Sequence, residues 1–258
     1  MSCLLYATDL HGNVAAYEEL FALPAEAIVL GGDLLPHPSG AGERLPEIQR
    51  AFARDYLAAK FRSRPCFWIP GNDDLAAALA PLDGVGTPIH GRAVEFLDGL
   101  WIAGYACVPV TPFSLKDFDR YDDDGWEPAR VPRSWKASGP AGWRATSPDE
   151  IRSLGTIARD LERLAALSDP AKTVYVAHTP PWGTGLDRLG DGTPVGSRAL
   201  RAFLERRGPP LSLHGHIHES PGVARLGRTV AVQPGDSAAR LRAVRVNLGD
   251  FSVTPLLP

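Results

Sequence analysis

Five short polar motifs stand along this chain, and they carry side chains of the kinds that bind divalent metal ions. In chain order the donors that they offer are Asp, His, Asp, Asn, His, His and His. Each motif comes just after a short apolar run that is typical of a buried β-strand. Because ligands bind beyond the carboxyl ends of parallel strands, we expect these side chains to meet at one edge of a sheet. The motifs are Asp9-Leu10-His11, Gly32-Asp33, Gly71-Asn72-Asp73-Asp74, His178 and Gly215-His216-Ile217-His218.

The spacing of these donors suits two metal ions that share one carboxylate. Asp9 and His11 are separated by one residue, so both can turn toward one ion, and His216 and His218 have the same spacing. Asp33 stands alone at its strand end, as a bridging carboxylate does. Two metal ions about 3.5–4 Å apart can hold both the attacking and the leaving oxygen of an in-line displacement. The set therefore predicts a di-metal hydrolase.

Each motif alone also has a simpler explanation. A strand-end aspartate is often the N-cap of a helix, and a lone histidine such as His178 is often a polar residue at the edge of a core. The ordered set, with every member at a predicted strand end, favours a metal site. His214, which precedes Gly215, is expected to lie in the core or to support a ligand from behind.

Apolar runs and helical spacing predict an α/β fold in the first part of the chain. Three buried strands are expected at residues 3–8, 27–30 and 66–69. Between them, apolar residues at helical spacing predict helices at 13–23 and 45–61. Strand and helix alternate in this way when a parallel sheet is built from right-handed crossovers.

The second part of the chain predicts a hairpin, two further strands, two helices and a β-rich end. Asp98-Gly99 is typical of a tight turn between strands, and Ser147-Pro148-Asp149-Glu150 is typical of a capped helix start. A pair of mixed sheets with helices outside, in one domain over residues 1–258, accounts for the pattern. The expected strands are 93–97, 100–105, 173–177, 211–213, 223–226, 229–232, 241–247 and 251–256, and the helices run from 147 to about 167 and over 197–207.

The segment 109–146 fits no regular element. It holds repeated Pro, Gly and Ser residues and three tryptophans, which argue against simple disorder. Two interpretations stay open: a lid over the site, or a segment that packs on the surface or contacts another subunit. Three arginines in it are equal candidates for gripping a phosphate group. They are Arg130, Arg133 and Arg144.

Composition limits the classes of function. The chain has 258 residues, 44% hydrophobic content and a net charge of −3, so binding that rests on neutralising the phosphates of nucleic acid is not expected. Cys3, Cys66 and Cys107 lie in apolar runs and are expected to be buried reduced thiols. No secretory signal or membrane span is predicted, and a cytoplasmic location is expected.

The five motifs and their order resemble those of the calcineurin-like metallophosphoesterase superfamily, over nearly the whole chain. The resemblance implies a four-layer α/β/β/α sandwich and two divalent ions, among Mn, Fe, Zn, Ni and Co. It implies that a water or hydroxide bridging the two ions attacks the phosphate ester. By resemblance, one ion is bound by Asp9, His11 and His218, the other by Asn72, His178 and His216, and Asp33 bridges them.

One residue departs from the superfamily's pattern. Asp73 stands where most members have a histidine after Gly-Asn, a histidine generally assigned to the leaving group or the transition state. An ionised Asp73 repels a phosphate and can act as an acid only if its pKa is raised. Slow turnover or a good leaving group is then expected, and a phosphodiester is favoured. Asp33, Asn72 and Asp73 are the expected catalytic residues, and Asp74 is expected to orient a ligand.

Two residues near the motifs are candidates for contact with a small phosphate-ester substrate. His37 lies in the loop after Asp33, where a histidine is often merely exposed. Asn13 is expected to cap the first helix and can also reach a phosphate. Two other classes of function remain: an interaction module on the same fold with weak catalysis, and a nuclease. The intact ligand set disfavours the first, and the lack of a basic region disfavours the second. A homo-oligomer is also possible.

Overall fold

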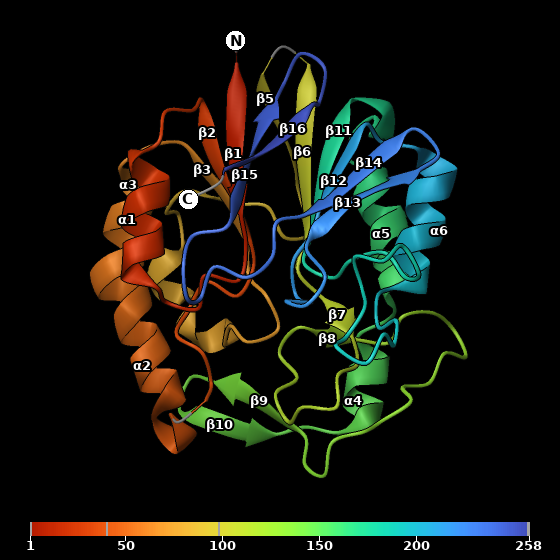
Figure 1. Cartoon of the computed structure of the whole chain (residues 1–258). Helices are drawn as coiled ribbons and strands as arrows, with labels where there is room; N and C mark the ends of the chain where they lie inside the picture. The colour runs from red at the N-terminus through yellow and green to blue at the C-terminus, as the bar shows by residue number, and fades with distance from the viewer. Residues whose placement is uncertain (1, 40, 98, 257–258) are drawn as a thin grey trace.

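Two six-stranded mixed sheets face each other, and helices cover their outer faces (Figure 1). The structure, a computed structural model, describes residues 2–39, 41–97 and 99–256. The expected four-layer α/β/β/α sandwich is confirmed. In the described part of the chain, no helix is both long enough and apolar enough to cross a membrane.

The first sheet has the strand order β16-β15-β1-β2-β3-β4. Its strands β1 to β4 are parallel, and the chain's last two strands add to the β1 edge in antiparallel fashion. The strands are β1 (Cys3–Ala7), β2 (Ala27–Gly31), β3 (Cys66–Ile69), β4 (Thr87–Pro88), β15 (Ala243–Asn247) and β16 (Val253–Leu256).

The second sheet has the strand order β13-β14-β12-β11-β6-β5. Its four middle strands are parallel, and each edge strand pairs antiparallel with its neighbour. The predicted hairpin of β5 and β6 is confirmed, although Asp98 of its turn lies outside the described residues. The strands are β5 (Ala93–Leu97), β6 (Leu100–Tyr105), β11 (Thr173–Ala177), β12 (Leu211–Leu213), β13 (Gly222–Leu226) and β14 (Thr229–Gln233).

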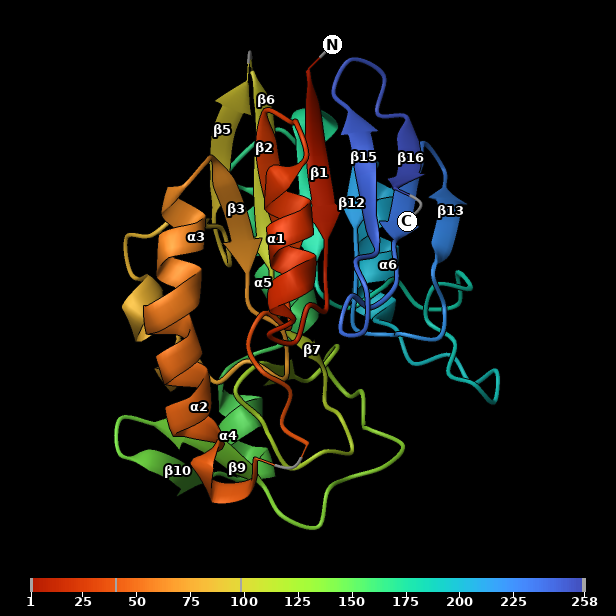
Figure 2. The ribbon, with the colours of Figure 1, turned by 60° about the vertical axis from the view of Figure 1, so that its left-hand side comes forward.

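The helices lie on the two outer faces of the sandwich (Figure 2). The first sheet is covered by α1 (Val14–Ala22), α2 (Leu45–Phe52) and α3 (Ala58–Arg62), and the second by α5 (Ile157–Ala165) and α6 (Arg198–Arg207). The short α4 (Pro148–Ser153) lies beyond the ends of the sheets.

Alternation along the strands divides the core into two layers. In β1, Leu5 and Ala7 pack with α1 and its neighbours, whereas Leu4 and Tyr6 pack in the layer shared with the second sheet. All four side chains are fully buried. A parallel strand covered on both faces therefore reads as a continuous apolar run, which explains why these strands were visible in the sequence.

Two predicted helices differ from the observed ones. The helix predicted at 45–61 contains one π-helical turn, Ala53–Leu57, and continues to Arg62. The helix predicted to run from 147 to about 167 is broken, because Gly155 takes a left-handed conformation (φ +93°) and the Thr156 side chain caps a new helix. The predicted cap at Ser147 is confirmed, since its side chain accepts a hydrogen bond from the Glu150 N–H.

The last two strands are shorter than predicted, beginning at Ala243 and Val253 rather than at 241 and 251. Phe251 has a φ of +55°, which ends the turn before β16 and is incompatible with a strand.

The prediction that the segment 109–146 has no regular structure was wrong. It contains four short strands: β7 (Val108–Pro109), β8 (Asp119–Arg120), β9 (Lys136–Gly139) and β10 (Gly142–Ala145). A fully buried ion pair joins Lys116 to Asp119. Asp122 accepts hydrogen bonds from the Ser197 hydroxyl and from two backbone N–H groups at the start of α6. The ion pair lies within the segment, and the Asp122 hydrogen bonds attach the segment to the sandwich. Its role as a lid stays a prediction.

Candidate metal centre

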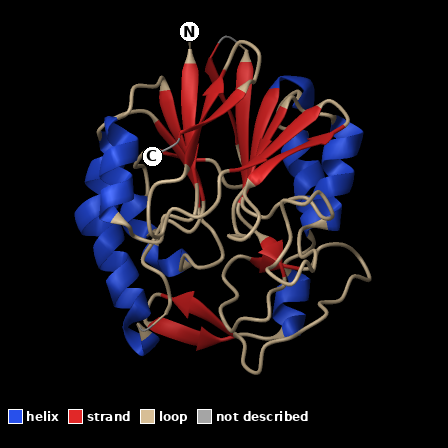
Figure 3. Ribbon diagram, in the orientation of Figure 1, coloured by secondary structure: helices blue, strands red, loops and turns tan. Residues whose placement is uncertain are grey.

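The five motifs meet below the two sheets, in the loops that follow β1, β2, β3, β11 and β12 (Figure 3). The first three strands belong to one sheet and the last two to the other. The candidate site is therefore built across the interface between the sheets, and neither sheet alone carries the whole donor set.

His178 crosses from the second sheet to the first. Its Nδ1 lies 2.8 Å from the carbonyl oxygen of Gly31, and because a carbonyl only accepts, Nδ1 carries the proton. The lone pair of Nε2 is thereby turned into the site. Nε2 lies 3.1 Å from Oδ1 of Asn72 and 3.3 Å from Oδ2 of Asp33. One ligand atom from each of His178, Asp33 and Asp9 also lies within 4.8 Å of the other two.

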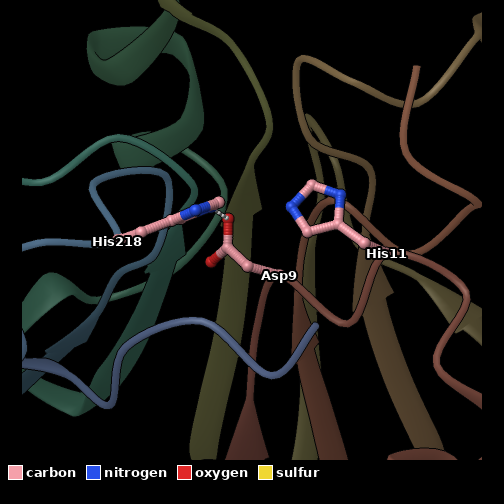
Figure 4. Close-up of side chains that lie close together, drawn as sticks. All are labelled: Asp9, His11 and His218. Atoms are coloured by element: carbon pink, nitrogen blue, oxygen red, sulfur yellow. Dashed lines mark hydrogen bonds and ion pairs between the residues drawn. The ribbon is translucent and has the colours of Figure 1, made fainter. Parts of the chain in front are cut away.

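A second group of donors consists of Asp9, His11 and His218 (Figure 4). One ligand atom of each lies within 4.8 Å of the others. The two histidines lie on opposite sides of Asp9, and Nε2 of His218 is 3.2 Å from Oδ1 of Asp9. The Thr8 hydroxyl donates to the other oxygen of Asp9 at 2.6 Å and holds the carboxylate in place.

The surroundings of His11 fit a metal ligand. Its side chain is 2% exposed, and neither ring nitrogen has a hydrogen-bond partner among the described residues. A buried polar atom without a partner is costly unless a ligand satisfies it. Mixed carboxylate, amide and imidazole donors without thiolate suit a divalent first-row metal ion.

His216 and Asn72 complete the predicted set in different ways. The ring centroid of His216 lies 5.3 Å from that of His178, and the backbone N–H of His216 donates to the carboxylate of Asp9. His216 itself belongs to none of the compact donor groups found among the described residues. Nδ2 of Asn72 donates to Asp73 at 3.1 Å, which leaves Oδ1 of Asn72 turned toward His178.

The carboxylates and histidines of the site shift one another's pKa values. Burial alone raises the pKa of Asp33, but the neighbouring His178 and His11 outweigh it and hold this pKa well below its usual range. Burial and the charges of Asp33 and Asp74 raise the pKa of Asp73 to about 8. Carboxylates gathered in this way favour a cation among them.

Four of the predicted ligands have an unusual backbone conformation. Asp9, His11, Asp33 and His216 have φ values of +53°, +45°, +51° and +70°. Phe251 is the one other non-glycine residue with a positive φ in the described part of the chain. Such conformations are costly for L-residues and cluster at functional sites, where the surrounding structure holds them. No periodic pattern in a sequence reveals them.

The motifs contain glycines because atoms of the predicted ligands lie very close to where a Cβ atom would be. A Cβ atom on Gly71 would lie 2.2 Å from Oδ1 of Asp33, and one on Gly32 would lie 2.4 Å from Nδ1 of His178. On Gly215 it would lie 2.4 Å from Oδ2 of Asp9. Any side chain at these positions displaces a predicted ligand, so Gly is needed beside each.

Asp74 and Gln49 hold together the loops that follow β2 and β3. The buried carboxylate of Asp74 accepts from the N–H groups of Leu34, Leu35 and Gly71, at 3.1, 2.8 and 2.9 Å. Gln49, fully buried on α2, donates to the carbonyl oxygens of residues 36 and 73 and accepts from the N–H of residue 75. This role of Gln49 was not predicted from the sequence; the only available signal was a polar residue on the buried face of a helix.

The remaining candidates have distinct surroundings. Asn13 caps α1, and its Nδ2 donates to the carbonyl oxygens of residues 237 and 238, so its predicted contact with substrate has no further support. His214 is fully buried as expected, with Nδ1 near two backbone carbonyls, and burial lowers its pKa to about 4. His37 lies at the site, 3.4 Å from Asp73. Arg144 pairs with Glu150 at the surface.

Comparison with known proteins finds a matching family and a similar sequence. The sequence profile of the calcineurin-like phosphoesterases matches residues 4–220. An uncharacterized protein of Methanocaldococcus jannaschii, MJ1162, is 23% identical over 254 residues, which are 95% of this chain and 94% of that protein.

Two solved structures share the fold. A dimetal phosphatase from Danio rerio aligns with a TM-score of 0.60 and 11% identity, covering 95% of this chain and 91% of that one. The protein TT1561 of Thermus thermophilus aligns with a TM-score of 0.59 and 18% identity, covering 99% of this chain and 98% of that one. At such identities the likeness shows the fold alone.

Proposed function

The chain belongs to the calcineurin-like phosphoesterase family, and within it we propose a metal-dependent phosphodiesterase that uses two divalent cations. The substrate class is a small phosphodiester. The proposal rests on the donor groups described above and on the residue that replaces the family's histidine.

One observation carries the two-cation proposal. A single carboxylate oxygen, Oδ2 of Asp33, lies 3.3 Å from Nε2 of His178 and 3.9 Å from Nε2 of His11. These two histidines belong to different donor groups, so Asp33 stands between them as a bridging ligand does. One cation would be held by Asp9, His11 and His218, and the other by Asn72, His178 and His216, with Asp33 shared.

The chain's own residues then have separate tasks. Bound cations supply Lewis-acid polarisation of the phosphoryl group and acidify water. Thr8 and the Gly31 carbonyl fix the orientations of Asp9 and His178, which sets where a phosphoryl group can lie. Asp73 lies beside this point, since its N–H donates to Oδ1 of Asp33 at 2.8 Å.

Asp73 is the reason to favour diesters over monoesters. A phosphomonoester carries a charge of about −1.5 to −2 at neutral pH, whereas a diester carries one negative charge. Cations bound at the donor groups would lower the raised pKa of Asp73 and favour its ionised form, and this carboxylate would repel the more highly charged monoester more strongly. The preference therefore follows from the aspartate at this position.

The proposal is tested by hydrolysis of bis-p-nitrophenyl phosphate beside p-nitrophenyl phosphate. Metal-stripped protein is assayed with and without added manganese, and then with the other candidate metals. We expect metal-dependent cleavage that favours the diester. A preference for the monoester would overturn the substrate class. A lack of turnover with every divalent metal would favour an interaction module on this fold.

A further inference from the structure

His37 and Asp73 come from different loops and face each other at the candidate site. His37 follows β2, and Asp73 follows β3 at the position where most of the family has a histidine. Nε2 of His37 lies 3.4 Å from Oδ2 of Asp73. The ring of His37 also meets the edge of the His11 ring, with 4.8 Å between centroids. An imidazole is thus present at the site although this chain lacks the family's histidine at position 73.

The hydrogen bonds of His37 define which ring nitrogen carries the proton. The backbone N–H of Ser39 donates to Nδ1 at 3.0 Å, so Nδ1 is an acceptor and the neutral ring carries its proton on Nε2. Among the described residues none accepts a hydrogen bond from this N–H, although Nε2 lies 3.4 Å from Oδ2 of Asp73. His37 therefore presents an available donor on the side of the ring that faces the donor groups.

The surrounding structure holds the two loops in this arrangement. Gln49 donates to the carbonyl oxygen of Pro36 at 2.9 Å and to that of Asp73 at 2.8 Å. It thereby joins the residue before His37 to Asp73 itself. A Cβ atom on Gly12 would lie 2.8 Å from Pro36, which shows how closely the His37 loop packs on the loop of His11.

Exposure places the pair at the mouth of the site. The side chain of His37 is 46% exposed and that of Asp73 is 20% exposed, whereas those of His11, Asp33 and His178 are at most 3% exposed. A ligand that enters from solvent meets His37 before it meets the buried donors. This order suits a residue that contacts substrate, although exposure alone does not distinguish His37 from a metal ligand, since the side chain of the predicted ligand His218 is 38% exposed.

We propose that His37, positioned by Asp73, supplies the imidazole that most of the family has at position 73. The Nε2–H of His37 donates a hydrogen bond to a phosphoryl oxygen, and Asp73 is the positioning residue that holds the ring. This inference rests on the proposed function, since it assigns a contact to the same substrate. The alternative is that His37, Asp73 and His11, whose ligand atoms lie within 4.8 Å of one another, bind a metal ion.

The test compares variants of both positions in the full chain. His37→Ala is expected to lower kcat/KM for bis-p-nitrophenyl phosphate by about 100- to 1,000-fold, as loss of one donor to a transition state does. His37→Gln, which keeps an N–H donor, is expected to retain more activity. Glu43→Ala, an exposed change in the same connection between β2 and α2, is the matched control and stays within about twofold of the unchanged protein.

Two double variants test whether His37 supplies the imidazole that this chain lacks at position 73. Asp73→His combined with His37→Ala restores the family's histidine at position 73. This double variant is expected to be at least about tenfold more active than His37→Ala alone. Asp73→Asn alone is expected to lower kcat/KM by about 3- to 10-fold. When His37 is already alanine, the same change is expected to lower kcat/KM by less than about twofold. Such non-additivity identifies residues that act as a unit, whereas a merely structural aspartate costs the same in both backgrounds.

Bound manganese and the affinity for inorganic phosphate are measured on each variant. We expect His37→Ala to keep its metal content and to bind phosphate about tenfold more weakly. Loss of one manganese ion would overturn the inference in favour of a metal ligand. Unchanged activity and phosphate affinity, or no rescue by Asp73→His, would also overturn it. If the unchanged protein hydrolyses no ester, the proposed function fails, and phosphate affinity still tests His37.

Discussion

Nδ1 of His178 lies 2.8 Å from the carbonyl oxygen of Gly31, and this contact joins the two sheets of the sandwich. Gly31 ends β2 in the first sheet, and His178 directly follows β11 in the second. The same contact fixes which ring nitrogen of His178 can serve as a metal ligand. The packing of one sheet on the other therefore sets the geometry of the candidate metal centre.

Asp33→Asn is expected to abolish hydrolysis while the fold stays intact. The amide keeps the shape of the side chain and an acceptor for the Asp73 N–H, but it loses the charge that the two proposed cations would share. We expect a loss of more than about 100-fold in kcat/KM, together with a loss of bound metal. Thermal unfolding of the metal-free protein checks that the fold is retained. Activity near that of the unchanged protein would show that the bridging role is wrongly assigned.

Gly71→Ala is expected to disturb the site through its contact with Asp33. The new methyl group would lie 2.2 Å from Oδ1 of Asp33 and 2.4 Å from its backbone nitrogen, so the loops must separate. Overpacking of this kind costs about 1–3 kcal/mol in the free energy of unfolding. Urea unfolding and metal content measure the effect. Gly190→Ala is the control, because a Cβ atom there meets nothing within 4 Å; equal effects of the two changes would refute the explanation.

Asp122→Ala is expected to destabilise the protein by about 1–3 kcal/mol. Its buried carboxylate accepts from the Ser197 hydroxyl and from the N–H groups of Arg198 and Ala199 at the start of α6. Removing it leaves these donors without a partner and removes a negative charge from a helix N-terminus.

The control for this change lies in the same run of aspartates. Asp124→Ala breaks an exposed ion pair with Arg159 and is expected to change the free energy of unfolding by less than about 0.5 kcal/mol. Chemical unfolding of both variants gives the comparison. If Asp122→Ala is as mild as Asp124→Ala, the segment 109–146 is not anchored through this cap.

His90 is expected to make the protein less stable as the pH falls. Burial lowers its pKa from 6.5 to about 4, so between these values the unfolded chain binds a proton that the native state excludes. The free energy of unfolding then rises with pH through this window and falls on acidification. The stabilising effect is complete above about pH 6.5 and is lost as the pH approaches 4.

The measurement compares the unchanged protein with His90→Asn at about pH 7 and about pH 5, on either side of the upper end of this window. Asparagine keeps an acceptor for the Ala106 N–H, which His90 Nδ1 accepts at 3.0 Å, but it does not titrate. We expect the variant to lose less stability between the two pH values. If both proteins lose the same free energy of unfolding between the two pH values, His90 does not contribute to the pH dependence.

Much of the fold could be predicted because its strands and helices have strong local signals. The strands β1, β2 and β3 are buried on both faces, and their apolar runs end at polar motifs. The helix break at Gly155 was missed because the apolar stripe continues across it, although Leu154 is 47% exposed. The short strands of the segment 109–146 were missed because two to four residues are too few to show a period.

The candidate metal-binding residues could be proposed from the sequence alone, and so could the strand ends that present them. Motif order and alternation are local properties, and they indicated the family and the fold. How segments distant in the chain meet is a matter of tertiary packing. That packing placed His37 beside Asp73, Gln49 between their loops, and His178 against Gly31. These contacts depend on how two sheets and their helices fit together, and such a fit leaves no periodic trace in a sequence.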